Sequence, residues 1–572
     1  MDTKGNLLFS RLNSRYSPVF LALLACWGFI NLAQGWLTEI HYDEAYYWMY
    51  SRHLDWGFFD HPPMIALFIK AGSLLFSGTL GVRFVTVIAQ LITLCLLWDL
   101  IGDKSADNRK ILTFFGIAAS VVMFQVYGFL ATPDSPLLLS TAVFLLGYKR
   151  FLVKESWPSI LLLGVSMAAL VYSKYHGVLL IFLIMASNPG LLRSRGFWIA
   201  GLIGLTLFIP HMAWQFQHDF PSLRYHLITR STAFNIKNSI NFFPNQLSSF
   251  NPFFLGLVIA LLLKTKPNDT FERGLYFIIT GILTFFFISS IRGHVEPHWT
   301  IAASIPMIIL VYRNCIDHPG RMKYLQFALF PTILILGFLR IALIVDILPI
   351  NLKFHGQEKW YNRLSALAGN TPVVFNNSYK QPSVYAFYTG KPATTLNSIF
   401  YRRNQYDLWP YEESFFGKEA LLVTNVNDPK AGRYDFPNGK KVYLHYTDHF
   451  FAVQQIQVKY DLQPSVKMKP GEVITLKAEI FNPYAYPIDF NDTGFPVTVN
   501  ALFLKDQKNI TITPVVVTPA LTELSPHQKQ SLDIVVEVPD LCPGKYKFGI
   551  SLKAGIIEEA FNSIPTSVLI VE

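Results

Sequence analysis

Charged residues are scarce in this chain of 572 residues: Asp, Glu, Lys and Arg together make up 15% of it. A soluble globular protein usually carries about a quarter charged residues. Hydrophobic residues reach 51%, with 48 phenylalanines, and their excess is confined to roughly the first 350 residues, in repeated runs long enough to cross a bilayer. The sequence therefore rules out a wholly soluble protein and predicts a polytopic α-helical membrane protein with a soluble C-terminal part.

Cysteines are also few. The four of them, Cys26, Cys95, Cys315 and Cys542, show no paired spacing, so the sequence predicts neither a disulfide framework nor a zinc motif. The formal net charge of +10 would suit a nucleic-acid partner, but the basic residues lie mainly in short loops between apolar runs, where they set membrane orientation. We therefore expect these charges to face a lipid bilayer and no nucleic acid.

Apolar runs predict eleven membrane spans, at residues 18–38, 79–101, 111–130, 135–148, 157–173, 177–188, 197–213, 252–263, 273–290, 299–312 and 324–347. Met64–Phe76 is also apolar. Counting it as a span would place the Lys and Arg clusters of the later loops outside the cell, so we interpret it as an interfacial helix. With that interpretation the loops predict a cytoplasmic N-terminus and an extracytoplasmic C-terminal part.

The composition changes after the last predicted span. Residues 351–450 alternate helical and strand-like pieces, which is typical of a small α/β module. Residues 451–572 contain short alternating strands separated by turn residues, which predicts an immunoglobulin-like β-sandwich. We therefore divide the chain into a membrane domain (1–350), an α/β module (351–450) and a sandwich (451–572), and neither soluble module carries a catalytic motif.

The segment His41–Pro63, HYDEAYYWMYSRHLDWGFFDHPP, follows the first apolar run directly and mixes carboxylates, histidines and aromatic rings. Aromatic rings of this kind suit the bilayer surface. An interfacial anchor would explain the rings but not the pair Asp43-Glu44, because acids are poor anchors beside anionic headgroups. A carboxylate here can deprotonate an alcohol, bind a cation or carry protons in a transporter, and a solvated loop acid is the simpler alternative.

Two shorter outer loops carry single charged residues, and each has a structural alternative. Asp134, in Ala131–Pro136, lies at the head of a predicted span, where an acid also caps the helix and contributes ~1 kcal/mol. Lys174, in Ser173–Gly177, offers a point charge suited to a phosphate, but a snorkelling lysine that fixes helix ends would look the same.

Two longer outer segments combine cations, histidines and aromatic rings. They are the loop 211–251, which contains His218, and Arg292–Trp299, which contains His298. Such a mixture suits a cleft for a sugar or a lipid phosphate. Histidines and acids together also allow a divalent metal, but their spacing fits no metal motif, so we predict no metal site.

The chain carries six motifs in a characteristic order: DEAYYW (Asp43–Trp48), GFFDHPP (Gly57–Pro63), ATPDSP (Ala131–Pro136), SKYHG (Ser173–Gly177), the stretch Trp214–His218, and EPHW (Glu296–Trp299). In this order they resemble bacterial members of the superfamily of protein O-mannosyltransferases and aminoarabinose (lipid A) transferases. The resemblance covers roughly residues 15–350. The C-terminal sandwich lies outside it.

The resemblance implies a C-type glycosyltransferase fold and an inverting transfer of a hexose or pentose from a polyprenyl-phosphate carrier. The implied acceptor is lipid A, a glycan or a protein. The implied place is a bacterial inner membrane, with the site on the periplasmic face, and no cofactor is required. A transporter or flippase of lipid-linked sugars is the rival, but it would usually show duplicated halves and charges near the midplane. A ligase or polymerase of lipid-linked sugars is a third alternative.

The resemblance also implies roles for single residues. Asp43 corresponds to the catalytic aspartate, and Asp134 to the acid of the second outer loop, which we expect to be catalytic as well by supporting the base. Asp60-His61 corresponds to an acid–cation pair in which the aminoarabinose transferases have lysine, so a phosphate role for His61 is in question and Lys174 is the candidate to take it. The residues expected to support the base or bind substrate are Glu44, Asp60, His61, Lys174, His218, Arg292 and His298.

Overall fold

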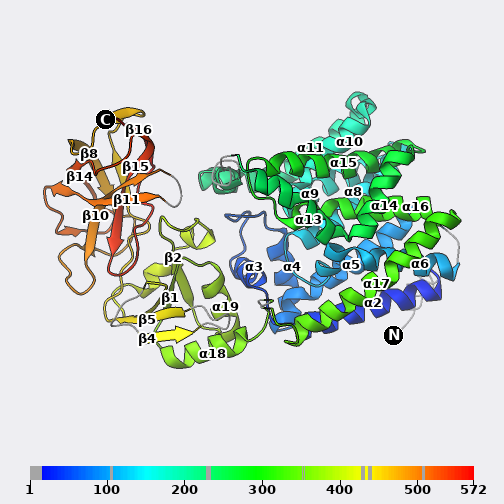
Figure 1. The fold of residues 1–572 in the computed structure, drawn as a ribbon, viewed down its shortest axis with the longest axis horizontal. Coiled ribbons are helices and arrows are strands. Elements are labelled where there is room, and N and C mark those ends of the chain that lie inside the picture. Colours follow the sequence, from blue (N-terminus) through cyan, green and yellow to red (C-terminus); the bar gives the residue numbers. More distant parts are fainter. Residues whose placement is uncertain are drawn as a thin grey trace. The chain divides into compact units, whose positions relative to one another are not determined.

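The computed structural model describes residues 16–103, 107–226, 234–350, 352, 354–426, 432–435, 441–505 and 509–572. The chain divides into two compact units, Met1–His355 and Gly356–Glu572 (Figure 1). Among the described residues, every β-strand belongs to the second unit. The first unit is helical.

The helical unit consists of helices joined by short turns. Its first half contains α2 (Pro18–Leu37), α3 (Tyr42–Arg52), α4 (Met64–Ser73), α5 (Gly78–Ile101), α6 (Asn108–Ser120), α7 (Val122–Val126), α8 (Asp134–Val153) and α9 (Trp157–Ser173). Its second half contains α10 (Gly177–Ser187), η1 (Pro189–Arg193), α11 (Arg195–Gln217), α12 (Pro221–Arg224), α13 (Ile236–Phe250), α14 (Pro252–Lys264), α15 (Thr270–Ser290), η3 (Pro297–Ala303), α16 (Ser304–Cys315) and α17 (Pro319–Ile344).

Within the described residues, six helices are long and apolar enough to cross a bilayer: α2, α5, α8, α11, α15 and α17. Helices α13 and α14 pass the same test together, but the chain bends by 103° between them. Helices α9 and α10 correspond to predicted spans and are apolar but short, with 17 and 11 residues. The unit is thus a multi-pass arrangement, while the total of eleven crossings stays a prediction.

The predicted span 111–130 is wrong as one continuous helix. The structure has α6, a break at Val121 and then the five-residue α7. Gln125 stabilises the break, because its Nε2 donates a 2.9 Å hydrogen bond to the carbonyl oxygen of Ala119. Hydrophobicity alone does not reveal this break, since the residues on both sides of it are apolar.

Two segments that the sequence places outside the membrane spans contain helices in the structure. The predicted outer loop 211–251 contains the end of α11, the short α12 and all of α13, and its residues 227–233 lie outside the described residues. The predicted interfacial segment Met64–Phe76 forms α4, which has ten residues and packs against α3 and α5. At about 1.5 Å per residue, α4 is only about half as long as the hydrocarbon core is thick, which the interfacial interpretation requires.

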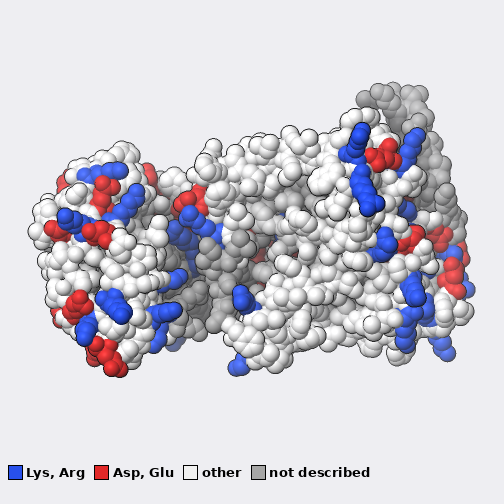
Figure 2. All heavy atoms as spheres, turned by 90° about the horizontal axis from the view of Figure 1, so that it is seen from above, with Lys and Arg blue, Asp and Glu red and all other residues white. Residues whose placement is uncertain are grey.

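The surface of the helical unit is apolar where a bilayer would lie. Large hydrophobic side chains are exposed along α2, α11 and α17, among them Phe29, Leu205 and Phe330. Figure 2 shows one face on which charged side chains gather mainly toward the ends of the unit and leave a broad uncharged band between them. A soluble monomer rarely exposes so much contiguous apolar surface, so this band supports contact with lipid.

The second unit begins with an α/β module. Its sheet has the order β2-β1-β3-β5-β4, in which β2, β1 and β3 run parallel and β4 and β5 are antiparallel. The elements are α18 (Gln357–Ala368), β1 (Val373–Asn376), α19 (Lys380–Thr389), β2 (Ala393–Leu396), η4 (Gln405–Asp407), η5 (Tyr411–Phe415), β3 (Ala420–Thr424), β4 (Gly432–Asp435) and β5 (Lys441–Thr447).

The remaining strands form a β-sandwich. A five-stranded sheet (β11-β10-β15-β16-β7) and a four-stranded sheet (β12-β14-β8-β6) bury alternate residues in one hydrophobic core, which the α/β module shares. The immunoglobulin-like topology stays a prediction. The strands are β6 (Gln457–Tyr460), β7 (Val466–Met468), β8 (Val473–Phe481), β9 (Ile488–Asp489), β10 (Val497–Leu504), β11 (Ile510–Pro514), β12 (Val516–Thr518), β13 (Glu523–Leu524), β14 (Lys529–Glu537), β15 (Gly544–Ala554) and β16 (Thr566–Ile570).

Candidate active site

Helix α3 begins with a capping box that fixes the acidic pair. The Nδ1 atom of His41 accepts a 3.3 Å hydrogen bond from the backbone N–H of Asp43, and the backbone N–H of His41 donates to Glu44 Oε2 at 3.0 Å. Such a box places acids in the first turn, where the helix dipole also stabilises them. The two neighbours then diverge: Glu44 is fully buried, whereas the Asp43 side chain is 31% exposed.

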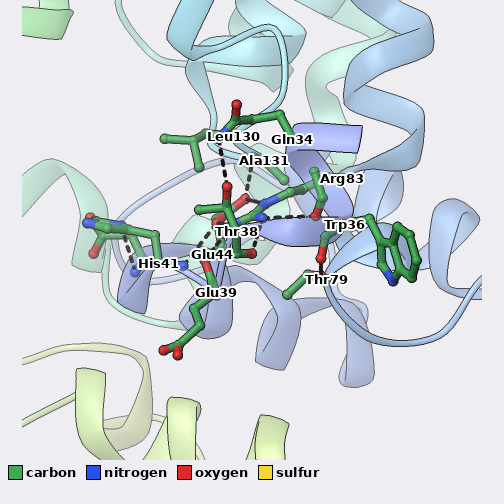
Figure 3. Close-up of polar contacts among 12 residues, drawn as sticks. Gln34, Trp36, Thr38, Glu39, His41, Glu44, Thr79, Arg83, Leu130 and Ala131 are labelled. Carbon is green, nitrogen blue, oxygen red and sulfur yellow. Dashed lines mark hydrogen bonds and ion pairs between the residues drawn. The ribbon is translucent and has the colours of Figure 1, made fainter. Parts of the chain in front are cut away.

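Glu44 forms a buried ion pair with Arg83 of α5 (Figure 3). Arg83 Nε donates to Glu44 Oε1 at 2.8 Å and Nη2 contacts Oε2 at 2.5 Å, while the backbone N–H of Ala131 donates to Oε1 at 2.8 Å. The remaining Arg83 donors bond to the carbonyl oxygens of Gly35, Thr38 and Glu39. The Arg83–Glu44 pair thus ties the end of α2, the start of α3 and the turn before α8 to α5.

The electrostatics of this pair keep Glu44 charged. Burial alone would raise the pKa of the Glu44 carboxyl, but the charge and hydrogen bonds of Arg83, with the N–H groups of Ala131 and His41, outweigh it and hold the pKa below its ordinary value. Both carboxylate oxygens are therefore engaged inside the protein. The structure thus gives Glu44, expected from the sequence to contact substrate, no exposed surface.

A second buried ion pair joins the other two short outer loops. Lys174, the C-cap of α9, donates from Nζ to Asp134 Oδ1 at 2.8 Å, and both side chains are almost fully buried. His298, at the start of η3, places Nε2 3.8 Å from Asp134 Oδ2. Three residues that the sequence singled out separately therefore meet here. Asp134 is the first residue of α8 and not its N-cap, which is Pro133.

His298 is surrounded by charged groups and stays neutral. Burial lowers its pKa, the Asp134 charge opposes this shift, the Lys174 charge adds to it, and the net result is a pKa below the ordinary value. The charges of Asp43 and Glu296 also act on His298, so the exposed acid of α3 belongs to the same group. The Tyr127 ring, at the end of α7, packs against the His298 ring with centroids 6.0 Å apart.

Asp60 and His61 lie in the loop between α3 and α4. Asp60 Oδ2 accepts hydrogen bonds from the hydroxyls of Tyr46, at 2.8 Å, and Tyr50, at 3.3 Å. Burial and then the nearby Lys174 charge lower the pKa of His61 well below its ordinary value, so His61 is neutral. Its Nδ1 atom is buried and has no hydrogen-bond partner.

His218 and Arg292 lie outside the group formed by Asp134, Lys174 and His298. The His218 ring stacks on Trp214 with centroids 4.3 Å apart, and its Nδ1 is 2.9 Å from the Trp214 carbonyl oxygen. The indole of Trp214 donates to Asp55 Oδ2 at 2.8 Å, which ties α11 to the loop after α3. Arg292 follows α15 and is exposed.

A polar network missed by sequence reasoning holds the turn after α9. His211, fully buried in α11, places Nδ1 2.7 Å from the Trp56 carbonyl oxygen and Nε2 3.1 Å from the Tyr175 hydroxyl. Gln215 Nε2 donates to the same hydroxyl at 3.0 Å and to Ser222 Oγ at 2.8 Å. Because Tyr175 follows Lys174 directly, this network fixes the lysine's backbone.

Three more residues of the site were not singled out: Arg83, Tyr127 and Glu296. Arg83 carried a signal, because it is a charge inside the predicted span 79–101, where charged residues are rare and usually have a partner. Glu296 belongs to the EPHW motif. Tyr127 carried no signal in the sequence, since its position depends on the unforeseen break before α7. Among the described residues, no group of three or more His, Cys, Asp or Glu side chains is placed to hold a metal ion.

Comparisons with known proteins find similarity to glycosyltransferases. Residues 60–214 match the family model of dolichyl-phosphate-mannose-protein mannosyltransferase. This range contains Asp134 and Lys174, whereas Asp43 and His298 lie outside it. A curated relative, the lipid A galacturonosyltransferase RgtD of Rhizobium johnstonii, is 24% identical over 299 residues, which are 48% of this chain and 60% of the relative.

The chain also resembles two solved structures of ArnT from Cupriavidus metallidurans. The apo structure superposes with a TM-score of 0.54 at 12% identity, over 75% of this chain and 97% of ArnT. The structure bound to undecaprenyl phosphate superposes with a TM-score of 0.51 at 12% identity, over 78% and 98% of the two chains. At this identity the likeness shows a shared fold.

Proposed function

We propose that this chain, which belongs to the glycosyltransferase superfamily of the protein mannosyltransferase and ArnT type, transfers a sugar from a polyprenyl-phosphate carrier to an acceptor. Support for the donor comes from ArnT, which shares the fold and was solved with undecaprenyl phosphate. Support for a lipid A acceptor comes from RgtD, although the chain spans only 60% of that relative's length. A glycan or a protein is the alternative acceptor.

The observation that carries the proposal is the different exposure of the carboxylates. Glu44, Asp60 and Asp134 are all buried, whereas 31% of the Asp43 side chain is exposed. A base must reach the hydroxyl whose proton it takes, so Asp43 is the group suited to that step. We assign Glu44 the role of holding α3 through Arg83, and not contact with substrate.

The reaction is a single displacement with inversion. The acceptor hydroxyl attacks the anomeric carbon, its proton passes to Asp43, and the bond from that carbon to the phosphate oxygen breaks with its electrons leaving on the phosphate. A positioned base contributes about 10²–10⁴-fold to such a step. Because the phosphate leaves as a stable anion, no general acid is needed.

The departing phosphate needs positive charge and hydrogen-bond donors. Lys174 supplies the buried charge, and the phosphate would compete with Asp134 for it. His61 is neutral and does not act as a cation, but its Nδ1 atom is unpartnered and can donate one hydrogen bond. The exposed Arg292 and the partly exposed His298 are candidates for contacts with the sugar or the outer part of the headgroup.

The site would face the periplasm in a bacterial inner membrane. The Lys and Arg loops favour a cytoplasmic N-terminus, and a carrier with its tail in hydrocarbon would reach a site at the bilayer surface from the side. Cysteines introduced singly at Leu192 and Asp219 test this orientation. An impermeant thiol reagent is expected to label the second but not the first in intact cells, and the reverse pattern would contradict the assignment.

The proposed activity is tested by reconstituting the purified chain in liposomes with radiolabelled polyprenyl-phosphate sugars, beginning with galacturonic acid. Separate reactions offer lipid A, a glycan and a protein as acceptors, with protein-free liposomes as the control. Label is expected to move to lipid A from one donor. Carrier-linked sugar that crosses the bilayer without chemical transfer would instead support a flippase and contradict the proposal.

A further inference from the structure

Arg340 lies in a membrane helix, and one nitrogen of its guanidinium is buried without a hydrogen-bond partner. It is on α17, four residues before the helix ends at Ile344. Nη2 makes all of the side chain's hydrogen bonds among the described residues: 2.7 Å to Asn31 Oδ1, 2.8 Å to Gln125 Oε1 and 3.2 Å to the Gln125 carbonyl oxygen. All three acceptors are neutral.

The other edge of the guanidinium is unused. Nη1 is buried and has no hydrogen-bond partner, and within the described part of the chain no carboxylate forms an ion pair with Arg340. Arg83, by contrast, has a carboxylate and three carbonyl oxygens. A charge inside a membrane helix is costly without compensation, so an unpaired arginine there indicates a missing anion.

The neighbours of Arg340 hold its side chain in one direction. Asn31 Nδ2 donates to Gln90 Oε1 at 2.7 Å and Gln125 Nε2 donates to the Ala119 carbonyl, so both amide oxygens are left to accept from Nη2. The guanidinium carbon also lies 5.2 Å from the centroid of the Phe129 ring. With Nη2 fixed in this way, the direction of the buried Nη1 edge is set, so binding an anion there costs little further side-chain entropy.

We propose that Arg340 binds the phosphate of a membrane lipid, at a site separate from the Lys174 position. A planar guanidinium matches phosphate oxygens well, and Arg340 is only partly buried, one turn from the end of a lipid-facing helix. Gln125, which accepts a hydrogen bond from Arg340, belongs to α7. The Tyr127 ring at the end of α7 packs on His298. A lipid headgroup bound at Arg340 would therefore steady the α7 turn that lines the candidate active site. The inference does not depend on the proposed transfer reaction.

The test measures lipid binding by the full-length protein in detergent. Wild type, Arg340→Gln and Arg340→Lys are titrated by native mass spectrometry with phosphatidylglycerol, with a polyprenyl phosphate and with diacylglycerol, which has no phosphate. Arg313→Gln is the matched control, because Arg313 also lies near the end of a helix of this unit, α16, but donates to the carbonyl oxygens of Leu100 and Ile101. Each variant is first checked for a single folded species.

Arg340→Gln is expected to weaken binding of a phosphate lipid about tenfold or more, because a charge-assisted hydrogen bond is lost. Arg340→Lys keeps the charge and is expected to retain part of the affinity. Loss for phosphatidylglycerol identifies a bulk phospholipid as the ligand, and loss only for polyprenyl phosphate identifies the carrier. Unchanged affinity for both lipids in both Arg340 variants, or an equal loss with diacylglycerol, would overturn the proposal.

Discussion

Buried carboxylates occur in both units, but their surroundings differ. In the helical unit Glu44 pairs with Arg83 and Asp134 pairs with Lys174. In the second unit Glu412 has only neutral partners: within the described residues its side chain accepts 3.4 Å hydrogen bonds from Gln455 Nε2 and the Tyr484 hydroxyl and forms no ion pair. The comparison teaches what a cationic partner does for a buried acid: within the described residues Glu44 has one and Glu412 does not.

The pKa values follow this division. Arg83 holds the pKa of Glu44 below its ordinary value despite burial. Burial raises the pKa of Glu412 to about 7, and that of Asp407, which is also held by neutral donors and backbone, to about 6. Glu44 therefore keeps its charge beside the candidate active site, whereas Glu412 and Asp407 of the second unit titrate nearer neutral pH.

Breaking the Glu44–Arg83 pair is expected to have the largest effect. Arg83→Met leaves a fully buried carboxylate unpaired, which costs about 3–5 kcal/mol of stability. The fraction of monodisperse protein after membrane extraction and the unfolding temperature are the measurements. Lys110→Met is the control, since its pairs with Asp103 and Asp317 lie at the surface. A stable Arg83→Met protein would contradict the structural role given to Glu44.

A double-mutant cycle on the second ion pair, Lys174–Asp134, separates the structural role of Lys174 from its contact with the donor. Lys174→Met is expected to slow transfer by about 10- to 100-fold, because the phosphate loses a charged contact. It also leaves Asp134 unpaired, so the double variant Lys174→Met/Asp134→Asn removes that cost. If Lys174 contacts the donor, the double variant regains stability but not turnover. Recovery of both would show that Lys174 only neutralises Asp134.

The smallest effect concerns pH and the second unit. The folded-state pKa of Glu412 lies above its unfolded value, so its stabilising contribution is fully present below about pH 4.5 and is lost as the pH rises through about 7. Glu412→Gln cannot ionise and is expected to show a weaker loss of thermal stability between pH 5 and pH 8 than wild type. Parallel pH curves for the two proteins would contradict this prediction.

Sequence reasoning identified the members of the site better than their roles. Asp134, Lys174 and His298 were singled out from three distant motifs, and the structure brings them together. The sequence did not reveal which of the adjacent residues Asp43 and Glu44 turns inward. Neighbours on a helix point about 100° apart, and Arg83, the residue that pairs with Glu44, is 39 residues away in the chain.

The fold was predictable to a similar depth. Apolar runs located the membrane helices and alternating strands located the sandwich, because burial on one face leaves a periodic signal. At the break at Val121, Gln125 bonds locally to the Ala119 carbonyl and accepts a hydrogen bond from Arg340 of α17. The contact with Arg340 is a tertiary contact without a local signal. His218 shows the same limit. Its motif was recognised, but the motif did not reveal that the His218 ring stacks on Trp214.

The central claim is that Asp43 acts as the base, and a donor-binding titration run beside a transfer assay on Asp43→Asn tests it most directly. Asp219→Asn is the matched control, since it is the same change at an exposed acid paired with Arg224. The account predicts that Asp43→Asn folds and binds polyprenyl phosphate as wild type does, while transfer falls by about 10²-fold or more. Transfer at the wild-type rate would contradict the claim, and loss of donor binding would give Asp43 a recognition role instead.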